Sequence, residues 1–203
     1  MTTRADGQDT TVLAASPQGE EGQSPAASAE FDTPLGPMVG IATAGGLCRL
    51  EFADRPGMRE LLGASPRPGG PIPGSAEGRS ARDHLDRARG ELTAYFAGTL
   101  HEFSIPLAAA GTPFEQRVWE RLRGIPYGRT CSYGELARAI DCPGGARAVG
   151  RANGANPIAI VVPCHRVIES SGGLRGYGGG LHRKRFLLDH EARTAGAAPA
   201  LFD

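Results

Sequence analysis

Two helix-start signals in the second half of the chain constrain its fold more than any other feature. Residues 112–115 (TPFE) and 132–135 (SYGE) each have the spacing of a capping box, in which a hydroxyl residue and a glutamate three positions later satisfy free N–H groups of the first helical turn. Proline at the first helical position strengthens the first signal. The sequence therefore predicts a helix that ends at Gly124 and a second, short helix that runs through Ile140.

A third helix is predicted in the stretch ARAVGRANGANP (residues 146–157), which follows the turn DCPGG and is stopped by Asn156 and Pro157. Two short helices joined by a glycine-containing turn are typical of a helix-turn-helix. Small residues occupy every second position from 146 to 154. Such a helix could pack closely against another helix, or it could press on a DNA minor groove only about 6 Å wide.

The first half of the chain predicts a small α+β domain. Residues 36–52 (GPMVGIATAGGLCRLEF) predict two strands joined by a hairpin, and residues 82–98 predict an amphipathic helix. The Pro/Gly-rich stretch 64–78 predicts a loop between them. We therefore divide the chain into a disordered tail (1–29), an N-terminal α+β domain (30–106), a second domain (107–195) and a C-terminal tail (196–203).

Charge is distributed unevenly although the formal net charge is zero. Residues 1–112 contain 9 Arg against 14 Asp and Glu, a net charge of −5, whereas residues 113–195 contain 12 Arg and 1 Lys against 7 Asp and Glu, a net charge of +6. The basic half suggests a polyanionic partner, with chance clustering on a solvated face as the alternative. The chain shows no signal peptide and no apolar run of membrane-spanning length, which predicts a cytoplasmic protein without a membrane partner.

One of the four cysteines has chemically active neighbours. Cys164 lies in IVVPCHRVI (residues 160–168), where a branched apolar run typical of a buried strand is followed by a thiol, an imidazole and a guanidinium. Cys164 is therefore either a core cysteine or a nucleophile, and the adjacent His165 and Arg166 favour the nucleophile. The remaining cysteines lack such neighbours, and none of the four has metal-ligand spacing, so we expect no metal. The cysteines predicted to be inert are Cys48, Cys131 and Cys142.

Three segments of the second domain resemble the O6-alkylguanine-DNA alkyltransferase family. They are RAVGRANGANP (147–157), IVVPCHRVI (160–168) and GYGGGLHRKRFLLDHE (176–191). The resemblance is strong over residues 113–191 and weaker over 30–106. It implies an α+β fold, in which a small N-terminal α/β domain with an antiparallel sheet precedes a helical, winged helix-turn-helix-like domain that binds DNA and carries the catalytic residues.

The resemblance also implies a role for each matching residue. Cys164 would accept the alkyl group as a thioether, His165 would be the base that acts through a water, and Glu191 would orient the imidazole. Asn156 would brace the active-site turn. The residues implied to contact DNA or the flipped base are Arg147, which enters the base stack, Tyr133, which helps rotate the nucleotide out and protonates the leaving purine, Tyr177, which lines the pocket, Ser170, which contacts a phosphate, and Gly134.

The implied function is direct DNA repair by a monomer that needs no cofactor. It would transfer the alkyl group of O6-alkylguanine, and by extension of O4-alkylthymine, from double-stranded DNA to Cys164 after base flipping, and each molecule would act once. Ala159 and Gly178 replace a proline and a serine of some relatives at the pocket border, which leaves the tolerated alkyl size open. Two alternatives remain, namely a cysteine hydrolase, which would turn over, and a non-catalytic lesion-binding protein, against which the presence of Cys164 argues.

Overall fold

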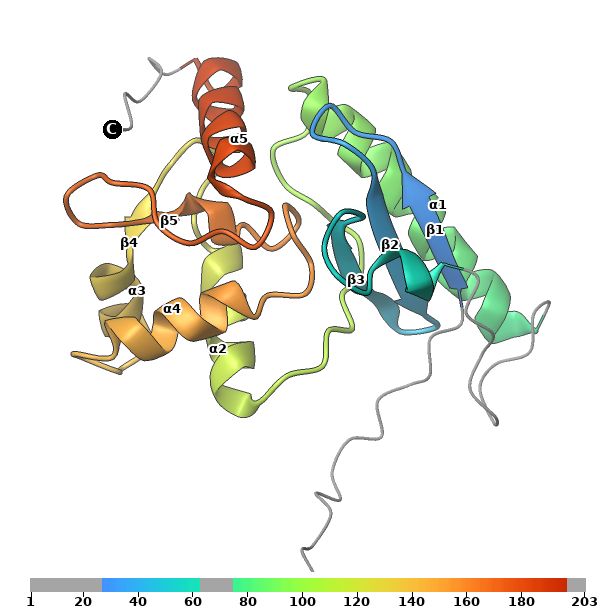
Figure 1. Ribbon diagram of the computed structural model, residues 1–203. Coiled ribbons are helices and arrows are strands. Elements are labelled where there is room, and N and C mark those ends of the chain that lie inside the picture. Colours follow the sequence, from blue (N-terminus) through green and yellow to red (C-terminus); the bar gives the residue numbers. More distant parts are fainter. Residues whose placement is uncertain (1–26, 63–74, 197–203) are drawn as a thin grey trace, which may run out of the picture.

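The computed structural model describes residues 27–62 and 75–196, which form an N-terminal α+β domain and a helical second domain side by side (Figure 1). The N-terminal domain contains β1 (Ala27–Phe31), β2 (Met38–Thr43), β3 (Gly46–Phe52), the 3-10 turn η1 (Arg59–Leu61) and α1 (Ala76–Phe96). The second domain contains α2 (Pro113–Arg123), β4 (Cys131–Ser132), α3 (Tyr133–Ala139), α4 (Ala146–Gly154), η2 (Cys164–Arg166), β5 (Val167–Ile168) and α5 (Leu181–Thr194). The predicted α+β class is confirmed.

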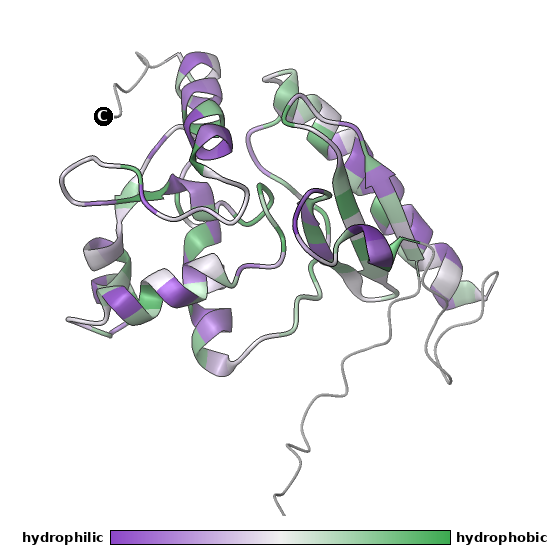
Figure 2. Cartoon of the chain, viewed as in Figure 1, coloured by the Kyte–Doolittle hydropathy of each residue, from purple (hydrophilic) through white to green (hydrophobic). Residues whose placement is uncertain are grey.

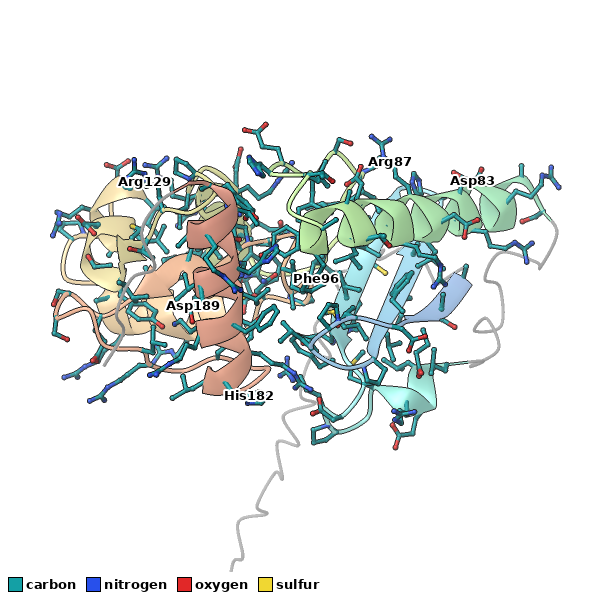
Figure 3. The ribbon with its side chains drawn as sticks, turned by 90° about the horizontal axis from the view of Figure 1, so that it is seen from above. Asp83, Arg87, Phe96, Arg129, His182 and Asp189 are labelled. Atoms are coloured by element: carbon teal, nitrogen blue, oxygen red, sulfur yellow. The ribbon has the colours of Figure 1, made fainter. Side chains whose placement is uncertain are left out.

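The N-terminal domain is an antiparallel sheet of order β1-β2-β3 with α1 along one face. The predicted hairpin is present as β2 and β3, which pair from Met38 opposite Phe52 to Thr43 opposite Gly46. Leu85 and Leu92 of α1 are buried against the sheet, and the view from above shows Asp83 and Arg87 on the other side of the helix (Figure 3). Hydropathy follows the same division, because apolar residues run along β2 while polar and apolar residues alternate on α1 (Figure 2).

Two boundaries in this domain differ from the sequence prediction. Strand β1 begins at Ala27, within the last three residues of the segment predicted as a tail. Helix α1 begins at Ala76, inside the stretch predicted as a loop, because the Ser75 side chain accepts a hydrogen bond of 3.1 Å from the Gly78 N–H and caps the first turn. The rest of the predicted N-terminal tail and most of the predicted loop lie outside the described residues.

Both capping boxes are formed in the second domain. Thr112 and Ser132 each accept from the glutamate N–H three residues later, and each backbone N–H donates to that glutamate carboxylate at 2.8 Å. Helices α2 and α3 therefore begin where the sequence predicts, and α4 packs against both of them. Val149 and Ala152 face this contact, whereas Arg147 is exposed, so the small-residue helix combines close packing with an open face.

The branched apolar run before Cys164 is a turn rather than the strand that its composition suggests. Val161 N donates to Ala159 O at 2.9 Å and Cys164 N to Val162 O at 2.8 Å, and Ile160 has a left-handed φ of 71°. A β-branched residue rarely adopts this conformation, so the turn must be held in place by its surroundings. Hydrogen bonds from the side chain of Asn156 hold part of this turn in place.

Strand β3 supplies a second restraint on this turn, from the other domain. Leu50 N donates to Pro157 O at 2.9 Å, and Ala159 N donates to Leu50 O at 2.8 Å. The turn is therefore attached to the edge of the N-terminal sheet by a pair of backbone hydrogen bonds.

In the part of the chain that the structure describes, no helix is both long and apolar enough to cross a membrane.

Candidate active site

Asn156 holds the turn that presents Cys164. Its Nδ2 donates to Val162 O at 2.9 Å and to Cys164 Sγ at 3.1 Å, while its Oδ1 accepts from Ile158 N at 3.0 Å. Cys164 is 6% exposed and begins the short helical turn η2. One amide side chain therefore fixes both the backbone of the turn and the sulfur atom.

His165 and Glu191 form a fully buried pair next to the cysteine. His165 Nε2 lies 2.8 Å from Glu191 Oε1, and neither side chain is exposed to solvent. Because a carboxylate only accepts, Nε2 carries the proton, and the neutral ring keeps its lone pair on Nδ1. Within the described chain, His165 Nδ1 has no hydrogen-bond partner, so it is the nitrogen free to receive a proton.

Three further groups donate to the same carboxylate, and two of them could not be predicted from the sequence. Arg166 donates through Nε to Oε2 at 2.8 Å and through Nη2 to Oε1 at 3.0 Å. Tyr95 O–H, from helix α1, donates to Oε1 at 2.8 Å, and Gly128 N donates to Oε2 at 3.1 Å. Arg166 stands inside the conspicuous motif, whereas Tyr95 and Gly128 are far away in sequence and have no local signal.

The environment sets the protonation states of the three central groups. Burial raises the pKa of the Cys164 thiol to about 11, although the Asn156 hydrogen bond opposes this, so the resting sulfur is protonated. Burial also lowers the pKa of His165. Burial alone would raise the pKa of Glu191, but hydrogen bonds and charges from His165 and Arg166 outweigh it and hold the pKa far below its ordinary value. The site therefore consists of a thiol, a neutral imidazole and a carboxylate.

A small cavity lies over the sulfur. It is lined by Cys164, Asn153, Asn156 and Ala159, by the glycine-rich segment 176–179, and by Glu51 and Arg55 from the N-terminal domain. Its free volume is about 10 Å³, room for about one water. Two of the residues that line the cavity carry a buried polar atom without a hydrogen-bond partner among the described residues, namely Asn153 Oδ1 and Tyr177 OH.

Gly178 and Ala159, the two positions on which the tolerated alkyl size is expected to depend, both border this cavity. A Cβ built at Gly178 would lie 2.9 Å from Arg55 Nη1, so the guanidinium occupies the space that a side chain there would need. Arg55 in turn is hydrogen-bonded to the buried carboxylate of Glu51. The N-terminal domain therefore closes one side of the cavity.

Three of the residues expected to contact DNA or the flipped base lie on one outer face of the second domain. Tyr133, Gly134 and Ser170 line a single open hollow of about 700 Å³, together with Ala146 at the start of α4. The Tyr133 hydroxyl donates to Arg175 O at 3.2 Å, and burial raises the pKa of this phenol. Arg147 is exposed on α4, and Tyr177 lies apart from this face, inside the cavity over the sulfur.

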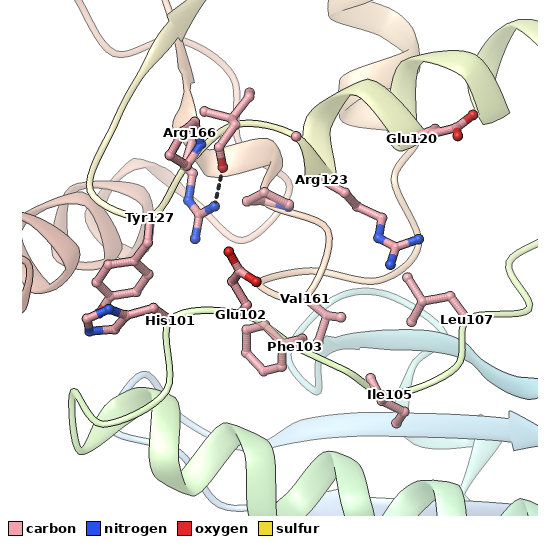
Figure 4. Close-up of a pocket in the computed structure, with 14 residues that line it drawn as sticks. His101, Glu102, Phe103, Ile105, Leu107, Glu120, Arg123, Tyr127, Val161 and Arg166 are labelled. Atoms are coloured by element: carbon pink, nitrogen blue, oxygen red, sulfur yellow. Dashed lines mark hydrogen bonds between the residues drawn. The ribbon is translucent and has the colours of Figure 1, made fainter.

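A larger cavity of about 470 Å³ lies on another side of the turn (Figure 4). Its walls include Val161 and Pro163 of the turn, Arg166, and Phe103 and Ile105 of the segment that joins the two domains. Arg166 Nη1 donates to Ile125 O at 2.6 Å in its wall. No thiol lines this cavity. We therefore assign the active site to the smaller cavity, because Cys164 lines it.

Neither the other three cysteines nor the residue types that can bind metals form a second candidate site among the described residues. All four cysteines lie in the described ranges and none forms a disulfide; Cys164 is buried, and the others are partly exposed. Over residues 27–62 and 75–196, no group of His, Cys, Asp or Glu is arranged to hold a metal ion.

The fold and the site together define a cysteine-dependent transferase built on a DNA-binding domain, and comparison with known proteins identifies its family. Residues 113–193 match the family described as "6-O-methylguanine DNA methyltransferase, DNA binding domain". The Mycobacterium leprae methylated-DNA–protein-cysteine methyltransferase is 45% identical over 173 residues, which are 85% of this chain and 96% of that protein. The Mycobacterium tuberculosis protein of the same name is 62% identical over 113 residues, 56% of this chain and 68% of the relative.

Solved structures agree with these relatives. The crystal structure of Mycobacterium tuberculosis OGT in complex with DNA is similar with a TM-score of 0.68 and 46% identity, covering 85% of this chain and 95% of that one. The O6-methylguanine-DNA methyltransferase of Pyrococcus kodakaraensis gives a TM-score of 0.51 at 28% identity, covering 81% and 97%. The chain belongs to the methylated-DNA–protein-cysteine methyltransferase family, and its function is direct DNA repair by alkyl transfer.

Proposed function

We propose that Cys164 is the acceptor, and that it takes the alkyl group from O6-alkylguanine in double-stranded DNA and keeps it. The observation that carries this proposal is the buried thiol, which lies next to a neutral His165 and an ionised Glu191 and lines a cavity together with the glycine-rich segment and α4. A thiolate is the softest nucleophile available in proteins and suits attack at a saturated carbon.

The transfer consists of one proton relay and one displacement. Cys164 gives its proton through a water to His165 Nδ1, and Glu191 stabilises the imidazolium that results. The sulfur electron pair then forms the S–C bond while the C–O6 bond breaks, and guanine leaves as an anion. A proton from the Tyr133 hydroxyl neutralises this anion. The tyrosine then regains a proton from solvent, and the imidazolium of His165 releases to solvent the proton that it took from Cys164. The thioether is stable, so each molecule acts once.

The outer face supplies the DNA contacts that this chemistry requires. The target base is stacked inside the duplex, so it must be rotated out, which costs a few kcal/mol. Arg147 projects from α4 to fill the vacated position, while Tyr133, Gly134 and Ser170 follow the backbone around the lesion. The protein acts as a monomer, with residues 30–106 and 107–195 as its two domains; O4-alkylthymine is a further candidate substrate.

The experiment that tests the proposal is mass spectrometry after mixing the protein with an excess of duplex that contains O6-methylguanine. One methyl group per protein should appear on the peptide that contains Cys164, and methyl loss from the DNA should then stop. Cys164→Ser should transfer nothing and still bind the duplex, whereas Cys48→Ser should behave like the wild type. Sustained turnover would instead indicate a hydrolase, and DNA binding without methyl transfer would indicate a lesion-binding protein.

A further inference from the structure

Lys184 of helix α5 is a charged side chain in the interior of the protein. It has no exposed surface, and its Nζ donates to Val167 O at 2.6 Å and to Arg175 O at 2.9 Å. Burial lowers the pKa of Lys184 to about 8, so the ammonium form predominates at neutral pH. A buried charge loses much of its hydration, so a lysine here indicates that its two hydrogen bonds matter to the fold or to the reaction.

The two carbonyl groups that Lys184 binds belong to two parts of the candidate site. Val167 follows η2, the turn that begins with Cys164, and it is the first residue of β5. Arg175 lies in the loop between β5 and α5, and its carbonyl oxygen also accepts from the Tyr133 hydroxyl at 3.2 Å. One ammonium group therefore connects the segment of the proposed nucleophile with the proposed proton donor.

The position of the Arg175 carbonyl depends on these side-chain hydrogen bonds. Residues 169–180 include six glycines, and among the described residues no backbone N–H donates to Arg175 O. Glycine-rich backbone can adopt many conformations, so other groups must hold a carbonyl within it in place. Of the two donors, Tyr133 must leave the carbonyl before it can protonate the purine. Lys184 is therefore the donor that remains on Arg175 O during the reaction.

We propose that Lys184 is a positioning residue for the transfer, and that its ammonium group fixes the Arg175 carbonyl to which the Tyr133 hydroxyl donates before it protonates the leaving guanine. This inference rests on the proposed function, in which Cys164 takes the alkyl group. A carbonyl oxygen has two lone pairs and can accept from both donors at once. When the hydroxyl turns to the base, the ammonium still satisfies the carbonyl, so releasing Tyr133 leaves no buried acceptor unpaired. Lys184 itself gives up no proton.

The test is a double-mutant cycle on single-turnover methyl transfer from a duplex with O6-methylguanine, measured with the full chain at saturating protein. Tyr133→Phe should slow transfer about a hundredfold, the usual contribution of a general acid. Lys184→Met keeps the length of the side chain but lacks the charge, and it should slow transfer about tenfold or more, because misplacing a catalytic group by ~1 Å can cost ~10²-fold. In the Tyr133→Phe background, Lys184→Met should change the rate less than about twofold.

A role of Lys184 in the fold alone predicts a different result. Lys184→Met would then slow transfer by the same factor with and without the Tyr133 hydroxyl, and this outcome would overturn the proposal. A wild-type rate in either single variant would overturn it as well, because there would be no effect on a proton donor. Affinity of Lys184→Met for the lesion duplex should equal that of the wild type, since the change acts on the rate and not on binding.

Two further variants complete the experiment. Arg185→Met is the matched control, because Arg185 is the next residue of α5 and is basic but exposed; it should leave the rate unchanged. Lys184→Gln keeps a donor for one of the two carbonyls, and it replaces Lys184→Met in the cycle if that variant does not fold. Failure of the proposed function would look different, since the wild type would then not methylate Cys164, and the inference would fall with it.

Discussion

The hydroxyl group of Tyr95 donates a 2.8 Å hydrogen bond to Glu191 Oε1, the same oxygen that binds His165 Nε2. Tyr95 lies in the last turn of helix α1 of the N-terminal domain, and Glu191 lies in helix α5 of the other domain. Tyr95 is fully buried and packs edge-on against Tyr127. The orientation of His165, the proposed base, therefore depends on a residue of the N-terminal domain, whereas the proposed nucleophile, Cys164, lies in the second domain.

We expect Tyr95→Phe to slow methyl transfer severalfold, because Glu191 loses one of the donors that fix its position. The protein should also lose about 1.5–3 kcal/mol of stability, the usual worth of a hydrogen bond to a charged group. Tyr127→Phe is the control, since its hydroxyl pairs with Thr194 at 2.6 Å and does not touch the carboxylate. Single-turnover rates and urea unfolding of both variants measure the effect. Equal rates for the two variants would contradict a role for Tyr95 in positioning.

Arg147→Ala should weaken both methyl transfer and binding to the lesion duplex, because the flipped state loses the side chain that fills the gap. Arg151 lies one helical turn further along α4 and is also exposed. Arg151→Ala should reduce affinity for damaged and undamaged duplex alike, as expected for a purely electrostatic contribution. Binding titrations with both duplexes distinguish the two variants. If Arg147→Ala behaved like Arg151→Ala, α4 would not be the element that enters the base stack.

Glu191→Gln should destabilise the protein by about 3–5 kcal/mol at neutral pH, because it leaves the buried Arg166 guanidinium without its counter-charge. The folded pKa of Glu191 lies below its ordinary value of 4.5. The stabilisation from the carboxylate is therefore complete above about pH 4.5 and is lost as the pH falls through the lower folded pKa. Denaturant titrations from pH 7 to pH 3 should show the gap between wild type and variant narrowing at the acidic end. A constant gap would argue against an ionised Glu191.

Methylation of Cys164 should lower the melting temperature of the protein. The cavity over the sulfur has a free volume of about 10 Å³, room for about one water, so a methyl group on the sulfur leaves no spare space. Overpacking of this kind typically costs about 1–3 kcal/mol. Helix α4 should yield first, because it is rich in Gly and Ala and Asn153 joins it to the Cys164 carbonyl. Thermal melts and limited proteolysis around residues 145–156, compared between the two forms, would measure this; identical results would show that the methyl is accommodated without strain.

The parts of this structure that follow from local sequence were predictable. The two capping boxes define the starts of α2 and α3 because their hydrogen bonds form within four residues. The hairpin of β2 and β3 also depends on a short, glycine-containing connection. Strand β1 was not predicted, since it is short and its pairing partner, not its own pattern, determines its conformation.

Residues of the candidate site could be predicted only where they lie in the part of the sequence that resembles the family. The composition of residues 158–162 favours a strand, yet Asn156 and β3 impose a turn on it through contacts that local propensity does not include. Tyr95 was missed for a similar reason, because it reaches Glu191 across 96 residues of chain.

The two hydrogen bonds between Leu50 and the segment 157–159 have a consequence for how the molecule can be divided. Chain order suggests a cut between residues 106 and 113, but such a cut would remove the backbone partner of the turn that carries Cys164. In terms of cooperative units, the turn belongs to the N-terminal sheet as much as to its own domain. A fragment that starts at residue 107 would retain every residue of the motif but would lack the β3 backbone that holds the turn of Cys164 in place. Adding residues 27–106 as a separate chain should restore the conformation of this turn.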